Sequence, residues 1–200
     1  MINAGYVFGK RLLPVALALL VTVSGPVFAD EIEGGGNEDN RVVGAEIFAG
    51  IHAHAVETPF TLATGEAGVD IMAGYRFAPL DALSVISRPA PYILASLNSQ
   101  GDTSFAGGGL GWKIWLGRVY ARPGIGLIVH DGPGRRIAPD GRRLDLGSRV
   151  LFEPELGIGA AISDRFSIEA SWVHISHARL FDARQNPGID MIGIRLNWRQ

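Results

Sequence analysis

The stretch that decides the fold is Phe166-Ser-Ile-Glu-Ala-Ser-Trp172, in which apolar and polar residues alternate one by one. Alternation with a period of two predicts a β-strand that has one apolar and one polar face. The segment 188–199 repeats the pattern, with isoleucines and a leucine on one face and Arg195 and Asn197 on the other. We therefore expect the two segments to form neighbouring antiparallel strands, joined by the loop between them.

Similar alternating segments of about ten or more residues recur along the chain and predict eight strands. Short connections such as Leu116-Gly117 alternate, for the most part, with long polar ones such as 130–146. This alternation of connection lengths is typical of outer-membrane barrels. The expected strands are 42–53, 66–76, 90–99, 104–115, 118–129, 147–162, 165–177 and 188–199.

The chemistry of the two strand faces favours a membrane barrel over a soluble one. In the segment 147–162, Leu156 and Ile158 lie on an apolar face, and Glu153 and Glu155 lie on the opposite face. Lipid outside and a salt-bridged interior suit this division, whereas a secreted lipocalin-like barrel would have the reverse polarity. We predict an all-β fold, an eight-stranded antiparallel transmembrane β-barrel of the outer membrane, whose interior is filled by side chains. The secreted barrel is the alternative.

The first 29 residues predict a signal peptide. Lys10 and Arg11 precede the apolar run 12–23, and a cleavage site follows at Ala29. The alternative is an uncleaved anchor, although the run is shorter than the roughly 20 residues of a spanning helix. The predicted organisation is a signal peptide at 1–29, a polar tail at 30–41 and one barrel at 42–200.

Composition excludes several other classes of function. The chain has 18 basic and 20 acidic residues, so the broad positive surface of a nucleic-acid-binding protein is not expected. It has no cysteine, so an exported fold has to be stable without disulfides. His52 and His54 have a spacing that suits a metal, but no cysteine or acidic cluster accompanies them, and surface histidines are the preferred interpretation.

A serine, a histidine and an aspartate lie on the apolar faces of the last two predicted strands. His174 and Ser176 are two residues apart on one face, and Asp190 lies on the corresponding face of the next strand. If the hairpin places Asp190 opposite His174, their Cβ atoms are ~5 Å apart. Ser176 would then be the nucleophile, His174 the base and Asp190 the acid that orients it. The alternative is a set of interfacial polar residues that ends a lipid-facing strip.

The sequence His174-Ile-Ser-His-Ala178, followed by Gln185-Asn-Pro-Gly-Ile-Asp190, resembles the C-terminal signature of the lipid A 3-O-deacylase family. The resemblance implies an eight-stranded outer-membrane barrel with its catalytic triad on the outer wall. Asp190 stands where the family has glutamate, and His177 stands where it has asparagine. The resemblance assigns His174, Ser176 and Asp190 to catalysis and Asn186 to the oxyanion hole. His177 and Gly188 are further candidates for oxyanion or substrate contacts.

The resemblance implies a serine esterase that removes the ester-linked 3-hydroxyacyl chain from the 3-position of lipid A. Such an enzyme needs no metal and no cofactor. The expected partners are lipid A within lipopolysaccharide, the outer membrane and, as an open alternative, a second copy of the chain in a homodimer. Two other functions remain as alternatives: a non-enzymatic structural or adhesion barrel, and another outer-leaflet lipid hydrolase such as a phospholipase.

Overall fold

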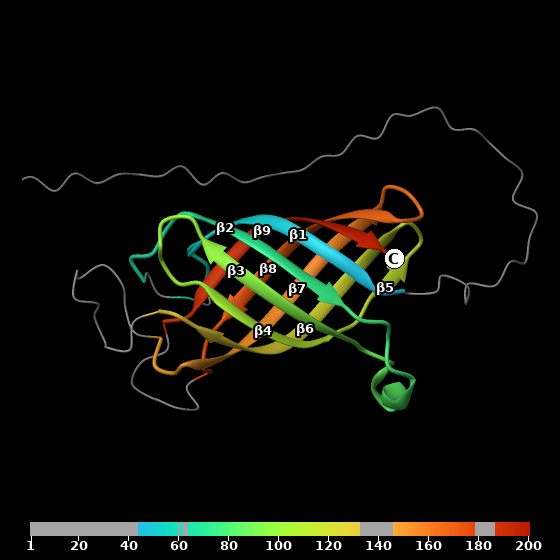
Figure 1. Ribbon diagram of the computed structural model, residues 1–200, viewed down its shortest axis with the longest axis horizontal. Coiled ribbons are helices and arrows are strands. Elements are labelled where there is room, and N and C mark those ends of the chain that lie inside the picture. The colour runs from blue at the N-terminus through green and yellow to red at the C-terminus, as the bar shows by residue number, and fades with distance from the viewer. Residues whose placement is uncertain (1–43, 60, 62–63, 133–145, 179–186) are drawn as a thin grey trace, which may run out of the picture. The chain divides into compact units, whose positions relative to one another are not determined.

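The strands form one closed antiparallel barrel (Figure 1). The predicted signal peptide and polar tail lie outside the residues that the structure describes. In the described part of the chain, no helix is long and apolar enough to cross a membrane. The computed structural model describes residues 44–59, 61, 64–132, 146–178 and 187–200.

Hydrogen bonds between the first and last strands close the barrel, because β1 pairs with β9 as well as with β2. The described residues form nine strands, but β4 and β5 both pair with β6 and form one interrupted strand of the wall. The wall therefore has the eight predicted strands. Their bounds are β1 Glu46–Ala53, β2 Val69–Arg76, β3 Ala90–Asn98, β4 Phe105–Gly111, β5 Ile114–Leu116, β6 Val119–His130, β7 Val150–Ala161, β8 Phe166–Ile175 and β9 Ile189–Arg199.

The glycine-rich run 107–111 allows close approach of β4 and β6. A Cβ atom added to Gly107 would lie 2.2 Å from the carbonyl oxygen of Leu127, and one added to Gly109 would lie 2.2 Å from that of Ile125. Real Cβ atoms do not approach a carbonyl so closely. Glycine at these two positions therefore permits the close packing of the two strands.

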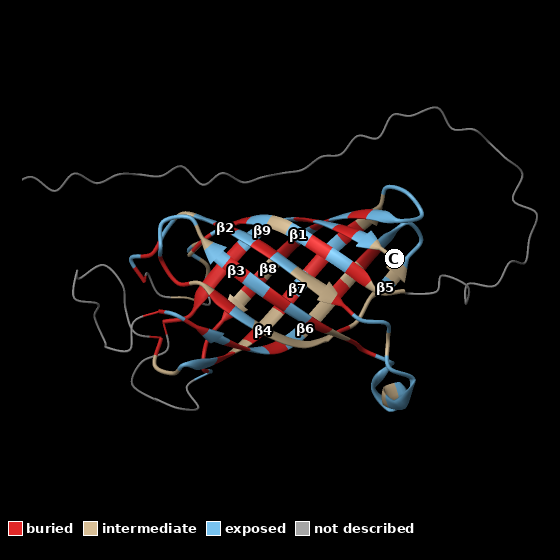
Figure 2. Cartoon of the chain, in the orientation of Figure 1, coloured by how far each residue is buried: buried red, intermediate tan, exposed pale blue. Residues whose placement is uncertain are grey.

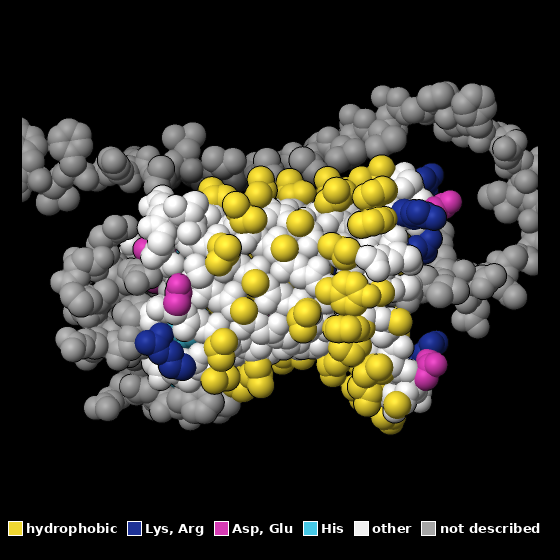
Figure 3. Space-filling model, in the orientation of Figure 1, with side chains coloured by type: hydrophobic (Ala, Val, Ile, Leu, Met, Phe, Trp, Pro, Cys, Tyr) yellow, Lys and Arg dark blue, Asp and Glu magenta, His cyan; other side chains and the backbone are white. Residues whose placement is uncertain are grey.

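Burial alternates along every long strand and separates the two faces of the wall (Figure 2). Ile51, Leu97 and Ile158 are 63%, 65% and 58% exposed, although they are large and apolar. Such side chains form a broad hydrophobic surface around the barrel (Figure 3). Their neighbours along each strand point inward, as the predicted polarity requires.

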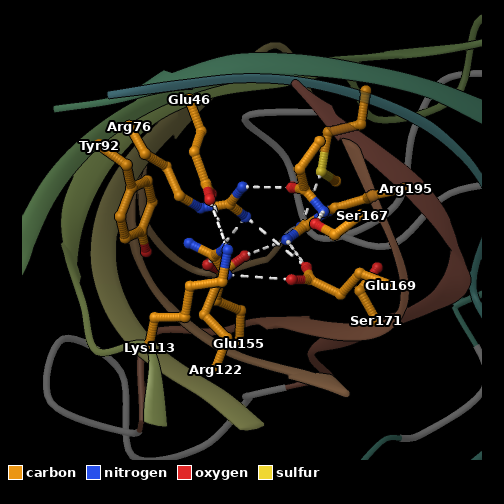
Figure 4. Close-up of polar contacts among 12 residues, drawn as sticks. Glu46, Arg76, Tyr92, Lys113, Arg122, Glu155, Ser167, Glu169, Ser171 and Arg195 are labelled. Atoms are coloured by element: carbon orange, nitrogen blue, oxygen red, sulfur yellow. Dashed lines mark hydrogen bonds and ion pairs between the residues drawn. The ribbon is translucent and has the colours of Figure 1, made fainter. Parts of the chain in front are cut away.

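Charged side chains fill one part of the interior and pair with one another (Figure 4). Arg122 donates hydrogen bonds to Glu169 at 3.0 Å and to Glu46 at 2.6 Å. Arg195 donates to Glu155 at 2.6 Å. A buried charge is tolerated when it is paired and hydrogen-bonded, as these charges are. The pairs also join strands from opposite sides of the barrel. The predicted salt-bridged interior is confirmed here.

The interior is not charged throughout, which the sequence analysis did not anticipate. The last inward residues of β8 are Val173 and Ile175, and the first of β9 are Ile189 and Met191. All four are at most 1% exposed and belong to one apolar cluster. This cluster packs behind the ends of β8 and β9 that carry the predicted reactive residues, so it gives that part of the wall a firm support.

The two ends of the barrel differ in their connections. The C-terminus and the tight turns after β5 and β7 lie at one end, together with the 3-10 helix η2 at Asp81–Ile86 (Figure 1). β8 ends and β9 begins at the opposite end, close to the loop between β1 and β2. The predicted reactive residues therefore lie at the long-loop end of the barrel.

Candidate active site

The register of β8 and β9 places His174 directly opposite Asp190, as the sequence predicts. His174 Nδ1 lies 2.8 Å from Oδ1 of Asp190, and His174 Nε2 lies 2.9 Å from Oγ of Ser176. An ionised carboxylate can only accept a hydrogen bond, so Nδ1 carries the proton and Nε2 accepts the hydroxyl proton of Ser176. The three side chains form one continuous hydrogen-bonded chain from hydroxyl to carboxylate.

Backbone pairing continues past the end of β8 and fixes Ser176. The Phe152 amide donates to the Ser176 carbonyl at 2.8 Å, and the Ser176 amide donates to the Phe152 carbonyl at 3.1 Å. This isolated bridge joins Ser176 to β7. The hydroxyl is therefore held by sheet geometry, although the serine is one residue beyond the strand.

The Asp190 carboxylate receives hydrogen bonds from three side chains. Besides His174, Trp172 donates its indole N–H to Oδ1 at 3.0 Å, and Thr58 donates its hydroxyl to Oδ2. The Val56 amide also donates to the Asp190 carbonyl at 2.9 Å. Thr58 could not be assigned to the site from the sequence, because a loop residue far along the chain has no periodic pattern. The position of Trp172, two residues before His174 on the same face, was a usable signal.

His174 lies on the face of β8 that also carries exposed apolar side chains. His174 follows the exposed Phe166 and Ile168 in the same every-second-residue series, and its side chain is 13% exposed. Asp190 is fully buried, because the loop after β1 and the ring of Trp172 cover it. We expected the aspartate to point toward lipid, but it is shielded. Ser176 is also buried, at 6% exposure, and His174 is the most exposed of the three.

Three further residues were expected at the site: Gly188, His177 and Asn186. Gly188 has φ +60°, and an added Cβ atom would lie 2.9 Å from Cε1 of His174, so the position requires glycine. His177 is fully buried next to the serine. Asn186 lies outside the described residues. A role of these three residues in an oxyanion hole stays a prediction.

His52 and His54 are buried in the structure, so their interpretation as surface histidines is wrong. His54 contacts Asp70 through Nδ1 at 2.8 Å and Glu66 through Nε2 at 2.9 Å. Burial alone would lower the pKa of His54, but the hydrogen bonds and charges of the two carboxylates outweigh it and raise the pKa to about 9. His52 instead contacts Ser171 at 2.7 Å. The described residues contain no group of three or more histidine, cysteine or acidic side chains that could hold a metal.

Comparison with known proteins identifies the family. The model of the family "Lipid A 3-O-deacylase (PagL)" matches residues 91–199, which is more than half of the chain. The chain belongs to this family. The crystal structure of the outer membrane enzyme PagL is similar in fold, with a TM-score of 0.56 and 16% identity over 78% of this chain and 99% of that one. Comparison with curated proteins gives no match.

Other solved outer-membrane barrels are similar at a lower level. The crystal structure of Neisserial surface protein A (NspA) has a TM-score of 0.47 and 9% identity, over 78% of this chain and 97% of that one. As a member of the lipid A 3-O-deacylase family, the chain is an ester hydrolase of the outer membrane. This membership decides against the secreted lipocalin-like barrel that the sequence analysis kept as an alternative.

Proposed function

We propose that this chain hydrolyses the ester-linked 3-hydroxyacyl chain at the 3-position of lipid A with Ser176, His174 and Asp190 as its catalytic triad. One observation carries the proposal: the three side chains form an unbroken hydrogen-bonded chain, with contacts of 2.9 and 2.8 Å, in a member of a deacylase family. Their order of hydroxyl, imidazole and carboxylate is the order that nucleophilic ester hydrolysis needs.

The proposed reaction has two steps that share the same base. Ser176 Oγ attacks the ester carbonyl while His174 Nε2 takes the hydroxyl proton. The tetrahedral intermediate then expels the 3-oxygen of the sugar, which receives that proton, and an acyl-serine remains. Water attacks the acyl-serine with His174 again as base, so the 3-hydroxy fatty acid is released and Ser176 regains its proton. Asp190 holds the ring tautomer and stabilises the imidazolium in both steps.

The outer side of the wall suits a substrate that is itself a membrane lipid. Lipid A in the outer leaflet would reach Ser176 by lateral diffusion, with its acyl chains on the exposed apolar residues of β8 and β9. Donors near the ester oxygen are typically worth a few kcal/mol in the transition state. We propose Asn186 for this role, as the resemblance implies, with His177 and Gly188 beside it.

Mass spectrometry of the lipid products tests the proposed function. The folded protein is incubated in detergent with lipid A and, separately, with phospholipid. We expect lipid A to lose the mass of one 3-hydroxyacyl chain and the phospholipid to stay intact, and Ser176→Ala and His174→Ala should abolish the loss. Ser163→Ala, in the tight turn at the other end of the barrel, is the matched control.

Each other outcome of this experiment has a definite meaning. Full activity of Ser176→Ala would overturn the triad. Release of fatty acid from phospholipid would indicate a phospholipase, and unchanged lipid A with the native protein would favour a structural or adhesion barrel.

Two further proposals concern processing of the chain and its oligomeric state. We propose that residues 1–29 are removed during export, so the mass of the mature protein should correspond to a chain that begins at Asp30. We also propose that the protein forms a homodimer, which chemical cross-linking in detergent tests.

A further inference from the structure

The loop between β1 and β2 contacts the proposed catalytic acid at two points. The Val56 amide binds the Asp190 carbonyl at 2.9 Å, and the Thr58 hydroxyl binds Oδ2 of the Asp190 side chain. One short segment thus holds both the backbone and the carboxylate of the same residue. This loop comes from the opposite end of the sequence, yet it reaches β9 because β1 and β9 are paired.

The two carboxylate oxygens of Asp190 have different partners. Oδ1 accepts from His174 at 2.8 Å and from Trp172 at 3.0 Å, whereas Oδ2 accepts from Thr58. An aspartate has a short side chain, and a hydrogen bond on each oxygen fixes the rotation of the carboxylate as well as its position. The Thr58 hydroxyl is therefore placed to stop the carboxylate from turning away from the imidazole.

The root of the same loop is anchored inside the barrel. The His54 amide donates to the Gly68 carbonyl at 3.0 Å, and the His54 ring lies between the carboxylates of Glu66 and Asp70 with its side chain fully buried. Thr58 is four residues beyond this anchor. The loop therefore has a fixed starting point from which Thr58 reaches Asp190.

We propose that Thr58 is a positioning residue, which acts through Asp190 to keep His174 correctly oriented. This inference rests on the proposed function, because it presupposes that His174 and Asp190 act in catalysis. A hydrogen bond to a charged group typically contributes an amount that corresponds to about 10–100-fold in rate. Since Thr58 does not touch the substrate in this scheme, its loss should lower kcat and leave KM nearly unchanged.

Four variants test this role. Thr58→Val keeps the shape but removes the hydroxyl, and it should lower kcat by about 10–100-fold. Thr58→Ser keeps the hydroxyl and should recover most of the rate. Thr58→Val added to Asp190→Ala should cause no further loss, because the group that it positions is already gone. Glu57→Gln, an exposed residue of the same loop, is the matched control and should have native kcat.

The outcomes separate this inference from the proposed function. If Asp190→Ala leaves kcat unchanged, the triad itself is wrong. If Asp190→Ala is severe but Thr58→Val is silent, only the role of Thr58 is wrong. A Thr58→Ser variant as slow as Thr58→Val, or an equal loss from Thr58→Val in the Asp190→Ala background, would show that the loop matters through packing and would also overturn it.

A separate observation concerns the connection 77–89 at the short-turn end of the barrel, which contains η2. No residue of this helix is buried, and Val85 is 89% exposed. Phe77 and Ile86 are each 45% exposed, and Leu80 is 40% exposed. A short turn in the periplasm has no reason to present four large apolar side chains to water.

The position of this connection beside the wall is fixed by contacts. The Trp112 indole donates to the Ile86 carbonyl at 2.7 Å, and the Phe77 amide donates to the Pro91 carbonyl of β3 at 2.8 Å. In Figure 3 the hydrophobic side chains of this region continue from those of the wall, and charged side chains lie at its outer end. The charged pair of η2 is Asp81 and Arg88, and both side chains are largely exposed.

We infer that η2 lies in the headgroup region of the periplasmic leaflet, with its apolar side chains among phospholipid acyl chains. Short turns mark the periplasmic end of outer-membrane barrels, so η2 is at the level of that leaflet. A helix with an apolar and a polar side is bound at such an interface by its buried apolar area. The Asp81–Arg88 pair then faces the periplasm.

The absence of cysteine from the sequence makes a direct test available. Single Val85→Cys, Ile93→Cys and Ser163→Cys variants are labelled with an environment-sensitive fluorophore and reconstituted into phosphatidylethanolamine–phosphatidylglycerol vesicles. We expect lipids with a shallow spin label to quench the Val85 and Ile93 positions, and aqueous iodide to quench Ser163. Quenching of the Val85 position by iodide to the same extent as Ser163 would overturn the inference.

Discussion

Two of the groups of buried polar side chains in the described part of the barrel are organised in opposite ways. Inside, carboxylates face guanidinium groups, as when Glu169 accepts from Arg122 or Glu155 from Arg195. In the group around the proposed catalytic site, called the outer group below, the Asp190 carboxylate contacts Trp172, Thr58 and His174, which carry no permanent charge. The two groups share β8 and β9, and they differ in which face of these strands carries them.

The difference indicates what each group contributes. A carboxylate that is paired with an arginine has its charge compensated at all times, which suits a support for the barrel. Asp190 is held by neutral donors, so its charge is available to the imidazole when His174 takes a proton. We therefore expect changes inside to act on stability and changes outside to act on rate.

Asp190→Asn should have the largest effect on the outer group. An amide in this position favours the wrong histidine tautomer, and such a change lowers kcat by about 10⁴-fold in serine hydrolases. The fold should be retained, as measured by circular dichroism. Asp164→Asn, in an exposed turn, is the matched control, and a native kcat in Asp190→Asn would contradict the division between the groups.

Arg195→Met tests the inner group. It removes the 2.6 Å contact of Arg195 with Glu155, whose other guanidinium neighbour, Arg76, lies 3.7 Å away. Breaking a buried ion pair in this way should cost about 3–5 kcal/mol of the unfolding free energy. The kcat per folded molecule should remain close to native. Thermal unfolding in detergent measures the loss, with the exposed Arg165→Met as control. An unchanged unfolding temperature would show that the inner ion pairs do not stabilise the barrel.

The stability contributed by the His54 cluster should depend on pH, because the imidazolium of His54 contacts the carboxylates of Glu66 and Asp70 and can lose its proton. With the pKa of His54 raised to about 9, the contribution to stability is fully present below about pH 6.5 and is lost as the pH rises through about 9. We expect a loss of about 2–3 kcal/mol of the unfolding free energy between pH 7 and pH 10. Urea unfolding of the native protein and of His54→Gln measures it, and the same slope in both proteins would contradict the assignment.

Gly188→Ala should have the smallest effect of these variants. Comparison with Gly101→Ala distinguishes a loss of kcat from a loss of stability. Alanine at a positive φ costs on the order of 1 kcal/mol, and the added Cβ atom would also displace the His174 ring. We expect kcat to fall about 10–100-fold. Gly101→Ala has a similar backbone penalty, with φ +73° and open space around the Cβ position, so it should lose stability without losing kcat. Equal kcat values in the two variants would contradict this role of Gly188.

Several features of the site could be predicted because they depend on neighbouring positions. The spacing of His174 and Ser176 places them on one face of a strand, and a hairpin register then brings Asp190 opposite His174. The contribution of Thr58 could not be predicted in this way, since it depends on the closure of the barrel by β1 and β9. The burial of His54 likewise depends on Glu66 and Asp70, which the sequence separates from it by a loop.

The sequence by itself determined the eight strands, their two faces and the order of the reactive residues, because a strand has a period of two and each face keeps its chemistry. It also indicated the family through the segment 174–190. The tertiary structure decided which neutral donors surround Asp190 and which interior residues are apolar rather than charged. Those contacts join segments more than a hundred residues apart, such as Thr58 and Asp190, and only closure of the barrel brings them within hydrogen-bond distance.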